Sequence, residues 1–304
     1  MEKFLLIANP AAQSGKGALI AEHAAALLRA GLSEDALSVV FTNQPMHASD
    51  IAAHSEGFAT IIALGGDGVI HEVVNGLMWR KAADRPSLGV IAAGSGNDYA
   101  RALGLSTKID QACDQLLRSE PYPVDIGKVN EDFFMETLSF GLDAAIALDT
   151  MERRKKSGRK GAVLYMESGF NQLMNHLDEY PYKASFDGGA LNESRLITFA
   201  VQMGPYYGGG FKICPEAKLD DGLFDVCISH PPITALKAIK TFLKAKSGKH
   251  VGMPNFEFER ARKLTLDFET EPPAQMDGEK VTGKHFDISI EHSAIRVLTP
   301  HDPL

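Results

Sequence analysis

A glycine-rich turn with an aspartate in its middle is the first place in this chain where residue types and spacing suggest chemistry. The segment Leu64-Gly65-Gly66-Asp67-Gly68 ends an apolar run over residues 58–64, which has the length and β-branching of a buried strand. Apolar residues then recur at helical spacing from Ile70 to Leu77. A strand-to-helix turn directs free backbone N–H groups and the positive end of a helix toward one point, which suits a phosphate.

The aspartate in this turn changes the kind of ligand that we expect. A carboxylate about 4 Å from a phosphate oxygen would be repelled by roughly 4 kcal/mol at an effective dielectric constant near 20. A divalent cation between the two groups would turn that repulsion into attraction. Asp67 therefore favours a metal–nucleotide site, and the alternative is a tight turn in which Asp67 only caps the following helix.

A second polar turn, residues 9–17, follows the predicted first strand at residues 4–8. It resembles a P-loop superficially but does not match the pattern. Pro10 stands where the first glycine is required, and Gly17 follows Lys16 in place of serine or threonine. The segment therefore disfavours a P-loop NTPase, and it leaves Lys16 open as either a phosphate contact or a solvated side chain.

A third turn, Ala93-Gly94-Ser95-Gly96-Asn97-Asp98, follows the apolar segment 88–92. Ser95 can donate to a phosphate oxygen, and Asp98 can bind the same metal as Asp67 or cap the next helix. Two glycine-rich turns that both carry an aspartate and both follow a strand favour the nucleotide interpretation over coincidence.

The elements that must position these turns alternate regularly. Strands are predicted at 4–8, 37–41, 59–64 and 88–92, and helices at 15–30, 47–55, 69–80 and 108–118. This alternation predicts an α/β domain with a parallel sheet and helices on both faces. Ligands of such sheets bind beyond the carboxyl ends of the strands, where the three turns lie.

The pattern changes after Pro121-Tyr122-Pro123. Most later segments are strand-like, and they are residues 133–140, 195–203, 224–228, 256–259, 263–268 and 285–298. The exceptions are the helical stretches 146–177 and 233–246. We therefore predict two domains, residues 1–124 and a β-rich sandwich-like or barrel-like domain over 125–304, with the last residues as candidates to return to the first domain.

The totals exclude several classes of protein. The chain has 304 residues, 44% of them hydrophobic and 23% charged, and its formal net charge of −8 argues against a general nucleic-acid surface. We expect no membrane-spanning segment, and residues 4–8 are too short for the core of a signal peptide. The cysteines, which we expect to be buried reduced thiols in a cytoplasmic protein, are Cys113, Cys214 and Cys227.

A basic cluster is the local exception to this acidic composition. Six of the eight residues from Arg153 to Lys160 are lysine or arginine. Such a cluster can bind anionic lipid headgroups, with about 1 kcal/mol for each basic residue near the surface. A solvated loop is the alternative. If the cluster meets lipid, Tyr165 and Phe170 are candidates for neighbouring contacts.

Taken together and in order, these motifs resemble the diacylglycerol kinase catalytic family, in the soluble bacterial branch related to sphingosine and ceramide kinases. Gly-Gly-Asp-Gly alone also occurs in NAD kinases and phosphofructokinases, but the resemblance covers essentially the whole chain. The matching segments are Asn9-Pro10 with Ser14-Gly15-Lys16-Gly17, Gly65–Gly68, Gly94–Asp98, Val124-Asp125-Ile126-Gly127, Tyr207-Gly208-Gly209-Gly210, Leu219–Asp225 and Met276-Asp277-Gly278-Glu279.

The resemblance implies an NAD-kinase/diacylglycerol-kinase-like nucleotide domain followed by a β-rich sandwich, with ATP and Mg²⁺ as cofactors. Asp67 and Asp98 would organise the phosphates and the catalytic Mg²⁺. A structural Mg²⁺ would be bound by the Asp221 side chain and the carbonyls of Lys218 and Leu223. The residues implied to contact ATP are Asn9, Pro10, Ser14, Gly15, Lys16, Thr42, Gly65, Gly66, Asp67, Gly68, Val69, His71, Glu72, Gly94, Ser95, Gly96 and Asn97.

The general base is implied to lie in the motif Asp277-Gly278-Glu279, and the sequence leaves both carboxylates open. Two positions depart from the family, which usually has threonine at Val69 and asparagine at His71. Ser95 replaces a usual threonine and keeps its hydroxyl. No carboxylate needed for metal binding is lost, so we expect an active enzyme with altered nucleotide contacts.

The implied reaction is transfer of the γ-phosphate of ATP to a lipid hydroxyl, first of all diacylglycerol to phosphatidic acid. Phosphatidylglycerol, a sphingoid base, or a soluble substrate of the NAD-kinase kind are the alternatives. A non-catalytic lipid-binding protein would leave Asp67, Asp98 and Asp277 unexplained. We expect a cytoplasmic protein in peripheral contact with an anionic membrane and no nucleic-acid partner, and a homodimer stays open.

Overall fold

The computed structural model describes residues 2–159 and 162–300, and the chain divides into two compact units. The first unit comprises the chain up to Ile126 together with the segment from His292 onward, and the second comprises Gly127–Glu291. Two long strands, β5 (Glu120–Val129) and β18 (His285–Thr299), carry the chain from one unit to the other.

The sheet of the first unit is built from parallel strands in the order β2-β1-β3-β4. These strands are β1 (Phe4–Ala8), β2 (Leu37–Phe41), β3 (Thr60–Gly65) and β4 (Ser87–Ala92). Residues of β18 pair with β4 in parallel, with Val297 opposite Leu88. Strands β3 and β4 are buried along their whole length, as expected for parallel strands that helices cover on both faces.

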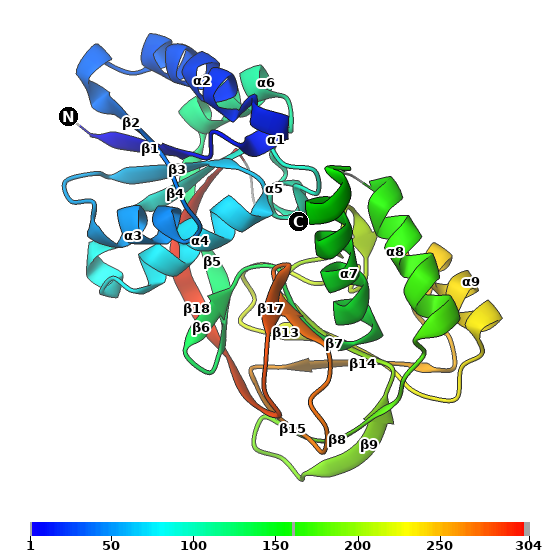
Figure 1. Ribbon diagram of the computed structural model, residues 1–304. Coiled ribbons are helices and arrows are strands. Elements are labelled where there is room, and N and C mark those ends of the chain that lie inside the picture. Colours follow the sequence, from blue (N-terminus) through cyan, green and yellow to red (C-terminus); the bar gives the residue numbers. More distant parts are fainter. Residues whose placement is uncertain (1, 160–161, 301–304) are drawn as a thin grey trace. The chain divides into compact units, whose positions relative to one another are not determined.

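Helices cover the two faces of this sheet, with α2 and α6 on one side and α3 and α4 on the other (Figure 1). The α-helices of the unit are α1 (Ala12–Gly15), α2 (Gly17–Gly31), α3 (His47–His54), α4 (Asp67–Met78), α5 (Asp98–Ala102) and α6 (Ile109–Arg118), and the 3₁₀ turns are Glu34–Ala36 and Ala82–Asp84. Leu28 and Leu116 pack with Leu6, Leu64 and Ile91 of the strands in one core. The predicted α/β class is confirmed. A helix was expected after the Gly94–Asp98 turn, where α5 begins, but the predicted helix ranges include neither α1 nor α5 because both are too short to show a helical period.

The second unit contains a sandwich of antiparallel strands. One sheet pairs β18 with β15 (Lys263–Phe268), β15 with β8 (Tyr180–Phe186), and β8 with β9 (Asn192–Leu196). The other has the order β14-β13-β10-β7-β16-β17, and its strands are β7 (Thr137–Gly141), β10 (Thr198–Gln202), β13 (Phe224–Ser229), β14 (Phe256–Ala261), β16 (Ala274–Met276) and β17 (Glu279–Val281). A short ribbon joins β11 (Tyr206–Tyr207) and β12 (Phe211–Lys212).

Aromatic side chains from both sheets fill the interior of this sandwich. The Phe140 ring of β7 lies 4.8 Å from the Phe286 ring of β18 and 5.3 Å from the Phe268 ring of β15, measured between centroids. Phe199 of β10 meets Phe140 edge to face at 6.3 Å. These contacts join the inner faces of the two sheets, and the predicted β-rich sandwich is confirmed.

The predicted strand 133–140 is wrong in one respect, because it is interrupted. The chain forms β6 (Asp132–Phe134), which pairs with β5, and then β7, which belongs to the other sheet. At the break, the backbone N–H groups of Met135, Glu136 and Thr137 all donate to the carboxylate of Asp277. A side chain from residue 277 therefore satisfies the donors that a continuous ladder would have paired.

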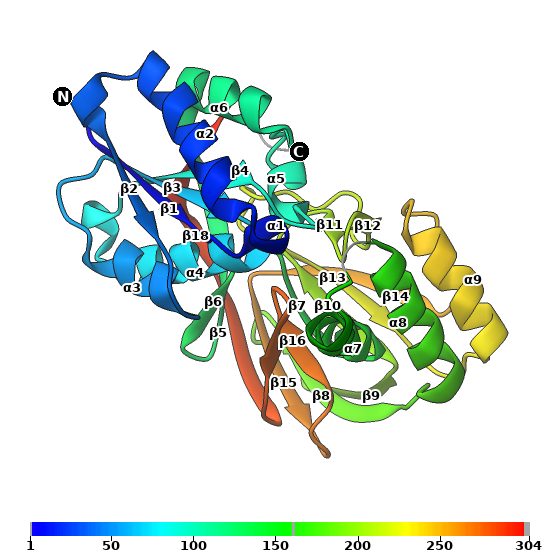
Figure 2. The ribbon, with the colours of Figure 1, turned by 45° about the horizontal axis from the view of Figure 1, so that its top comes forward.

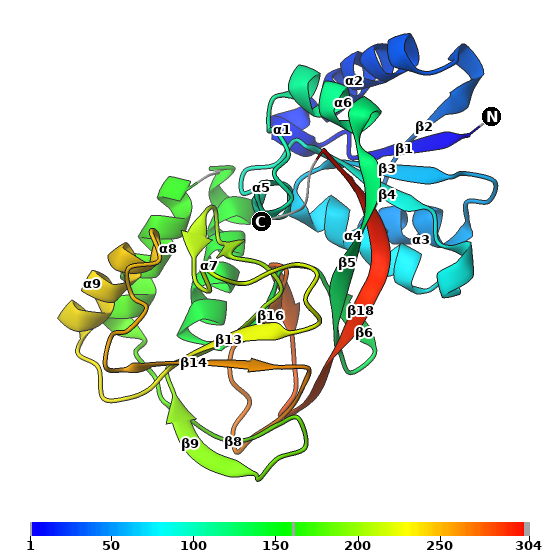
Figure 3. The same ribbon diagram turned by 180° about the vertical axis from the view of Figure 1, so that it is seen from behind.

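Three helices, α7 (Leu142–Ser157), α8 (Ala162–Asn175) and α9 (Ala235–Ala245), lie side by side in the second unit (Figures 2 and 3). No helix within residues 2–159 or 162–300 combines the length and apolarity that crossing a bilayer requires. The three cysteines are buried free thiols, as predicted. Burial raises the pKa of Cys113 to about 11, which keeps it in the unreactive thiol form.

Candidate active site

The turn that contains Asp67 joins the end of β3 to the start of α4. Gly66 precedes the helix with extended backbone, and the peptide at Gly68 is exposed to solvent. The exposed Gly68 peptide therefore lies at a helix N-terminus, while the N–H groups of Val69 and Ile70 donate to the Gly66 carbonyl. A Cβ atom placed on Gly94 would lie 2.4 Å from the Cα atom of Gly66, so the Gly65–Gly68 turn and the Gly94–Asp98 turn touch through their backbones and require glycine at the contact.

Asn97 connects these two turns. Its backbone adopts the left-handed conformation, with φ of 57°, and its side-chain Oδ1 accepts a hydrogen bond of 2.8 Å from the N–H of Gly94. Its own N–H donates to Oδ2 of Asp67 at 2.8 Å. The carboxylate of Asp67 is thereby held against the neighbouring turn, at a fixed orientation.

Asp67 and Asp98 are brought together in the first unit. One carboxylate oxygen of each lies within 4.8 Å of the other, and a Cβ atom on Gly96 would contact both side chains. Asp98 is buried and forms an ion pair with Arg101 one turn further along α5. Two carboxylate oxygens at this spacing fit a divalent cation such as Mg²⁺, which binds oxygen ligands at roughly 2.0–2.1 Å.

The turn that begins at Asn9 lies beside the Asp67 turn. The N–H of Asn9 donates to the Leu64 carbonyl at 3.3 Å, and its side-chain oxygen accepts from the N–H of Ala11 at 2.8 Å. A Cβ atom on Gly17 would lie 2.1 Å from the Asn9 carbonyl oxygen, so only glycine allows α2 to start here. The N–H of Thr42 donates to Ala8 at 2.9 Å, which adds the end of β2 to the same edge of the sheet.

The other residues that the family resemblance implies as ATP contacts are either exposed to solvent or packed within the first unit. Lys16, Ser95 and Gly15 are exposed, Gly15 with φ of 89°, and Pro10 is half-buried. The Ser14 side chain lies outside the part of the chain that the structure describes. The exposed set can therefore meet a ligand without rearrangement.

Three side chains of α4 are engaged within the first unit. The methyl groups of Val69 pack against Gly65, where an added Cβ atom would approach to 2.8 Å, and the side chain is buried. His71 is buried, with its Nε2 3.3 Å from the Asn75 amide. The Glu72 carboxylate accepts the N–H of Ala48 at 3.0 Å, in the first turn of α3. Val69 and His71, the two departures from the family pattern, thus have packing roles.

The structure places the two carboxylates of the Asp277-Gly278-Glu279 motif in different surroundings. Residues Asp277 and Gly278 form the two-residue loop of the β16–β17 hairpin, and both have positive φ, 47° and 90°. The Asp277 side chain is buried and accepts three backbone N–H bonds of 2.8–2.9 Å. The Glu279 side chain, directly after the loop, is exposed.

The hairpin loop is fixed on its other side by Gln275. The Gln275 side-chain oxygen accepts the N–H of Gly278 at 2.7 Å, and its amide donates to the hydroxyl of Ser139 at 2.7 Å. Asp277 and Gln275 together hold the loop rigidly, so that the backbone at Glu279 has one position. A carboxylate at the end of such a support is well suited to accept a proton from a bound hydroxyl.

The loop of residues 218–223 carries the carboxylate of Asp221 in the second unit. Asp221 accepts the N–H of Leu223 at 3.1 Å and forms an ion pair with Arg260, which also reaches Asp225 at 3.4 Å. Burial raises the pKa of Asp225, as does the negative charge of Asp221, while Arg260 lowers it. Oδ2 of Asp225 is buried and has no hydrogen-bond partner within residues 2–159 and 162–300, so this acidic loop fits a hard cation.

An apolar pocket lies inside the second unit, and no sequence motif indicated it. The centres of water-sized spheres can occupy about 90 Å³ of it. Helices α8 and α9 line it with Tyr165, Leu173, Thr241 and Phe242, and the strands contribute Thr198 and Phe256, among others.

Asp143, in the first turn of α7, is the carboxylate among the residues that line this pocket. Burial raises its pKa to about 7, and a hydrogen bond with the Ser139 hydroxyl opposes this rise to a smaller extent. Oδ2 of Asp143 has no hydrogen-bond partner in the described part of the chain. It can therefore donate or accept a hydrogen bond to a polar group that enters the pocket.

Comparisons with known proteins match both units. Residues 3–129 match the diacylglycerol kinase catalytic domain, and residues 136–299 match the YegS C-terminal NAD kinase beta sandwich-like domain. The diacylglycerol kinase of Bacillus subtilis is 31% identical over 92% of this chain and 90% of the relative, and that of Staphylococcus saprophyticus is 30% identical over 87% and 85%. This chain belongs to the diacylglycerol kinase family.

A crystal structure of a diacylglycerol kinase from Bacillus anthracis has the same fold, with a TM-score of 0.77 and coverage of 98% of this chain and 97% of that one at 23% identity. The family predicted from the motifs is therefore confirmed, and the chain is an ATP-dependent kinase. The pocket and Asp143 were missed because their residues are spread along the second unit. The only local signal was a carboxylate two residues after the end of the buried strand β7.

The raised pKa of Asp143 leads to a prediction about stability. The folded protein keeps a proton that an unfolded aspartate, with a pKa near ~3.9, releases, so stability is lost as pH rises from about 4 to about 7. Asp143→Asn should remove this loss, which amounts to at most ~4 kcal/mol. We expect its Tm, relative to the wild-type Tm, to rise between about pH 4 and pH 7 and to level off above pH 7.

The measurement is thermal unfolding followed by circular dichroism at each pH. Asp132→Asn, which changes an exposed aspartate of the same unit, is the matched control. Its Tm should differ from the wild-type Tm by the same amount at every pH. If the difference in Tm between Asp143→Asn and wild type were also the same at every pH, Asp143 would be ionised in the folded protein.

Proposed function

We propose that this kinase transfers the γ-phosphate of ATP to the hydroxyl group of a lipid alcohol, with diacylglycerol as the first acceptor to test. We assign ATP binding to residues 1–124 and lipid binding to residues 125–304. The observation that carries the proposal is the apolar pocket of the second unit. The names of the relatives from Bacillus subtilis and Staphylococcus saprophyticus support diacylglycerol as the acceptor.

The lining of the pocket supports an acyl chain as its occupant. Its walls are mainly aliphatic and aromatic, and burying a chain stabilises binding by about 0.8 kcal/mol for each methylene group. Asp143 supplies one polar contact in this lining and, because its pKa is raised to about 7, does so without a full charge in the apolar space near neutral pH. An ester or hydroxyl group of the acceptor fits this contact.

The three turns at the edge of the first unit's sheet support the ATP assignment. Backbone N–H groups at the start of α4 and the exposed Ser95 and Lys16 can bind phosphate oxygens. Asp67 and Asp98 would hold Mg²⁺, and this ion would neutralise the charge that develops on the transferred phosphoryl group. The hydrogen bond from Asn97 to Asp67 keeps that carboxylate oriented.

We propose Glu279 as the group that accepts the proton of the acceptor hydroxyl. Its exposed position at the end of a rigid loop supports this role, while the three hydrogen bonds to the Asp277 carboxylate support a positioning role for Asp277. We further propose that Asp221, with the carbonyls of Lys218 and Leu223, binds a structural Mg²⁺, which the buried Oδ2 of Asp225 would help to stabilise.

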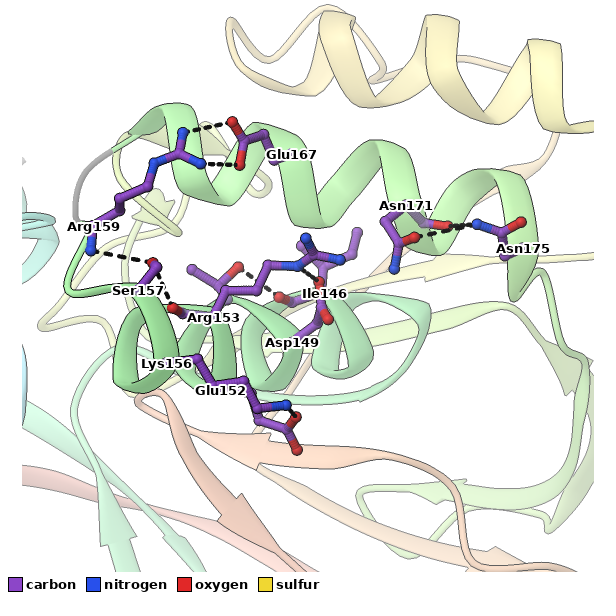
Figure 4. A network of polar contacts seen from close by, with 11 residues as sticks. Ile146, Asp149, Glu152, Arg153, Lys156, Ser157, Arg159, Glu167, Asn171 and Asn175 are labelled. Atoms are coloured by element: carbon purple, nitrogen blue, oxygen red, sulfur yellow. Dashed lines mark hydrogen bonds and ion pairs between the residues drawn. The ribbon is translucent and has the colours of Figure 1, made fainter.

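We propose peripheral contact with an anionic membrane, because a lipid acceptor resides there. The basic cluster at residues 153–160 supports this contact less strongly than its composition suggests. Arg153 pairs with Asp149 at 2.6 Å and Lys156 with Glu152 at 3.3 Å, and Arg159 forms a bidentate pair with Glu167 (Figure 4). Lys160 lies outside the described residues.

The test is an ADP-release screen with ATP, Mg²⁺ and one acceptor at a time. We expect turnover with diacylglycerol micelles above that with phosphatidylglycerol, a sphingoid base, undecaprenol or NAD. Ala238→Phe, which fills part of the pocket from α9, should lower kcat/KM for a long-chain acceptor by about tenfold or more and affect a short-chain acceptor less.

The matched control is Ala235→Phe, at a half-buried position of the same helix outside the pocket lining, which should keep wild-type kcat/KM for both acceptors. ADP formation with NAD but with none of the lipids would overturn the lipid assignment. Equal effects of Ala238→Phe on long-chain and short-chain acceptors would remove the pocket from the acceptor site.

A further inference from the structure

The outward face of α9 carries two parallel rows of side chains. Leu236, Ile239 and Leu243 recur at i, i+3 and i+7, and so do Lys237, Lys240 and Lys244. We call these six residues the α9 surface. Leu236 is 73% exposed and Leu243 49% exposed, and all three lysines are exposed. An apolar row beside a basic row on one helix is typical of helices that lie in a membrane interface.

The inward face of the same helix explains why the outward apolar row is not needed for folding. Ala238, Thr241 and Ala245 are buried, and the Phe242 ring packs 4.8 Å from the Phe211 ring. Thr234 caps the helix by accepting the N–H of Lys237. The fold therefore already fixes α9 through its inner side.

The charges of the α9 surface are available, whereas part of the basic cluster at residues 153–160 is neutralised and its exposed Arg154 and Lys155 keep their charge. Within residues 2–159 and 162–300, no ion pair involves Lys237, Lys240 or Lys244, whereas Arg153, Lys156 and Arg159 are paired with acids (Figure 4). In a chain with a net charge of −8, an unneutralised row of lysines is a local concentration of positive charge.

We propose that the α9 surface docks the protein onto a bilayer that contains anionic phospholipids. The lysines complement the headgroup charge, and the apolar row can enter the boundary of the acyl chains. This inference rests on the proposed lipid acceptor, because the inner sides of α8 and α9 line the apolar pocket. Docking through α9 would bring the helices that line the pocket to the lipid phase.

Two further observations favour a bilayer over a second copy of the chain. The neighbouring helix α8 also exposes apolar side chains, Val163, Phe170 and Met174, and it lies beside α9 (Figure 2). A two-fold contact of the α9 surface with itself would bring the three lysines of each copy together, which opposes self-association. An anionic bilayer surface attracts these lysines and does not repel them.

The test measures binding of the full chain to sedimented vesicles, without ATP or turnover. Vesicles contain either equal amounts of phosphatidylglycerol and phosphatidylcholine or phosphatidylcholine alone. Each lysine near an anionic surface contributes about fivefold, so K237Q/K240Q/K244Q should weaken binding to the anionic vesicles by about 100-fold. L236Q/L243Q should weaken it at least ~10-fold, and higher salt should weaken wild-type binding.

The matched control is K3Q/K81Q/K108Q, which removes the same charge from three exposed lysines of the first unit and should change binding less than ~3-fold. Equal losses in the control and the α9 variant, or wild-type binding by the α9 variant, would overturn the proposal. Loss of a dimer in L236Q/L243Q, seen by sedimentation velocity, would assign the surface to a second copy instead. If the protein bound vesicles but released no ADP with any of the lipids, the docking proposal would be supported and the proposed acceptor would be rejected.

Discussion

Replacing Asp67 with asparagine is expected to lower kcat by about 10³-fold, equivalent to about 4 kcal/mol of transition-state stabilisation. Asp67 lies within 4.8 Å of Asp98, and the two would share a divalent cation in the proposed function. An amide keeps the hydrogen bond from the N–H of Asn97 but removes the charge that attracts the cation. The loss should therefore appear in turnover and not in folding.

The measurement is ADP release at saturating ATP and acceptor, together with a thermal melt of the same sample. Asp84→Asn, at an exposed position of the same unit, is the matched control and should keep wild-type kcat. Raising the Mg²⁺ concentration should restore part of the activity of Asp67→Asn, because the remaining carboxylate binds the ion more weakly. A kcat within a factor of three of wild type at low Mg²⁺ would exclude Asp67 from the metal site.

Replacing the two carboxylates of the β16–β17 hairpin is expected to affect different properties, turnover for Glu279 and stability for Asp277. Glu279→Gln should lower kcat by about 10²–10⁴-fold, the range for loss of a general base, with little change in Tm. Asp277→Ala leaves the buried N–H groups of Met135, Glu136 and Thr137 without their acceptor. At roughly 1–3 kcal/mol for each, the loss in stability should be about 5 kcal/mol, which lowers Tm by roughly 10 °C or more.

Asp277→Asn separates the two roles further, since it keeps one acceptor oxygen and should fall between wild type and Asp277→Ala in Tm. The exposed Lys280→Gln, next to Glu279 in β17, is the control for a change of charge in this hairpin. Wild-type turnover by Glu279→Gln, combined with a folded but inactive Asp277→Asn, would move the base from Glu279 to Asp277.

The first unit could be predicted closely from the sequence because its signals are local. The four strands and the helices α2, α3, α4 and α6 each carry their own periodicity, and short polar turns separate them. Parallel strands bring their carboxyl ends to one edge, so the order of the motifs already placed Asp67 and Asp98 near each other. The backbone contact between Gly66 and Gly94 shows how closely the two turns that carry these aspartates approach each other.

The second unit was less predictable because its decisive contacts join residues far apart in the chain. The carboxylate of Asp277 satisfies N–H groups at 135–137, which interrupts an apolar stretch that reads as one strand. The α9 surface also depends on distant contacts. Its lysines stand out as a positive surface only because acidic side chains neutralise part of the basic cluster at residues 153–160.

The sequence by itself determined the family, the two kinds of fold and the identity of the glycine-rich turns, because residue types at fixed spacing specify these features. Only the tertiary structure distinguished the buried Asp277 from the exposed Glu279, explained Val69 by its packing on Gly65, and revealed the pocket around Asp143. The physical reason is that burial and hydrogen-bond partners decide what a carboxylate does. Both depend on residues that are distant in the chain and adjacent only after folding.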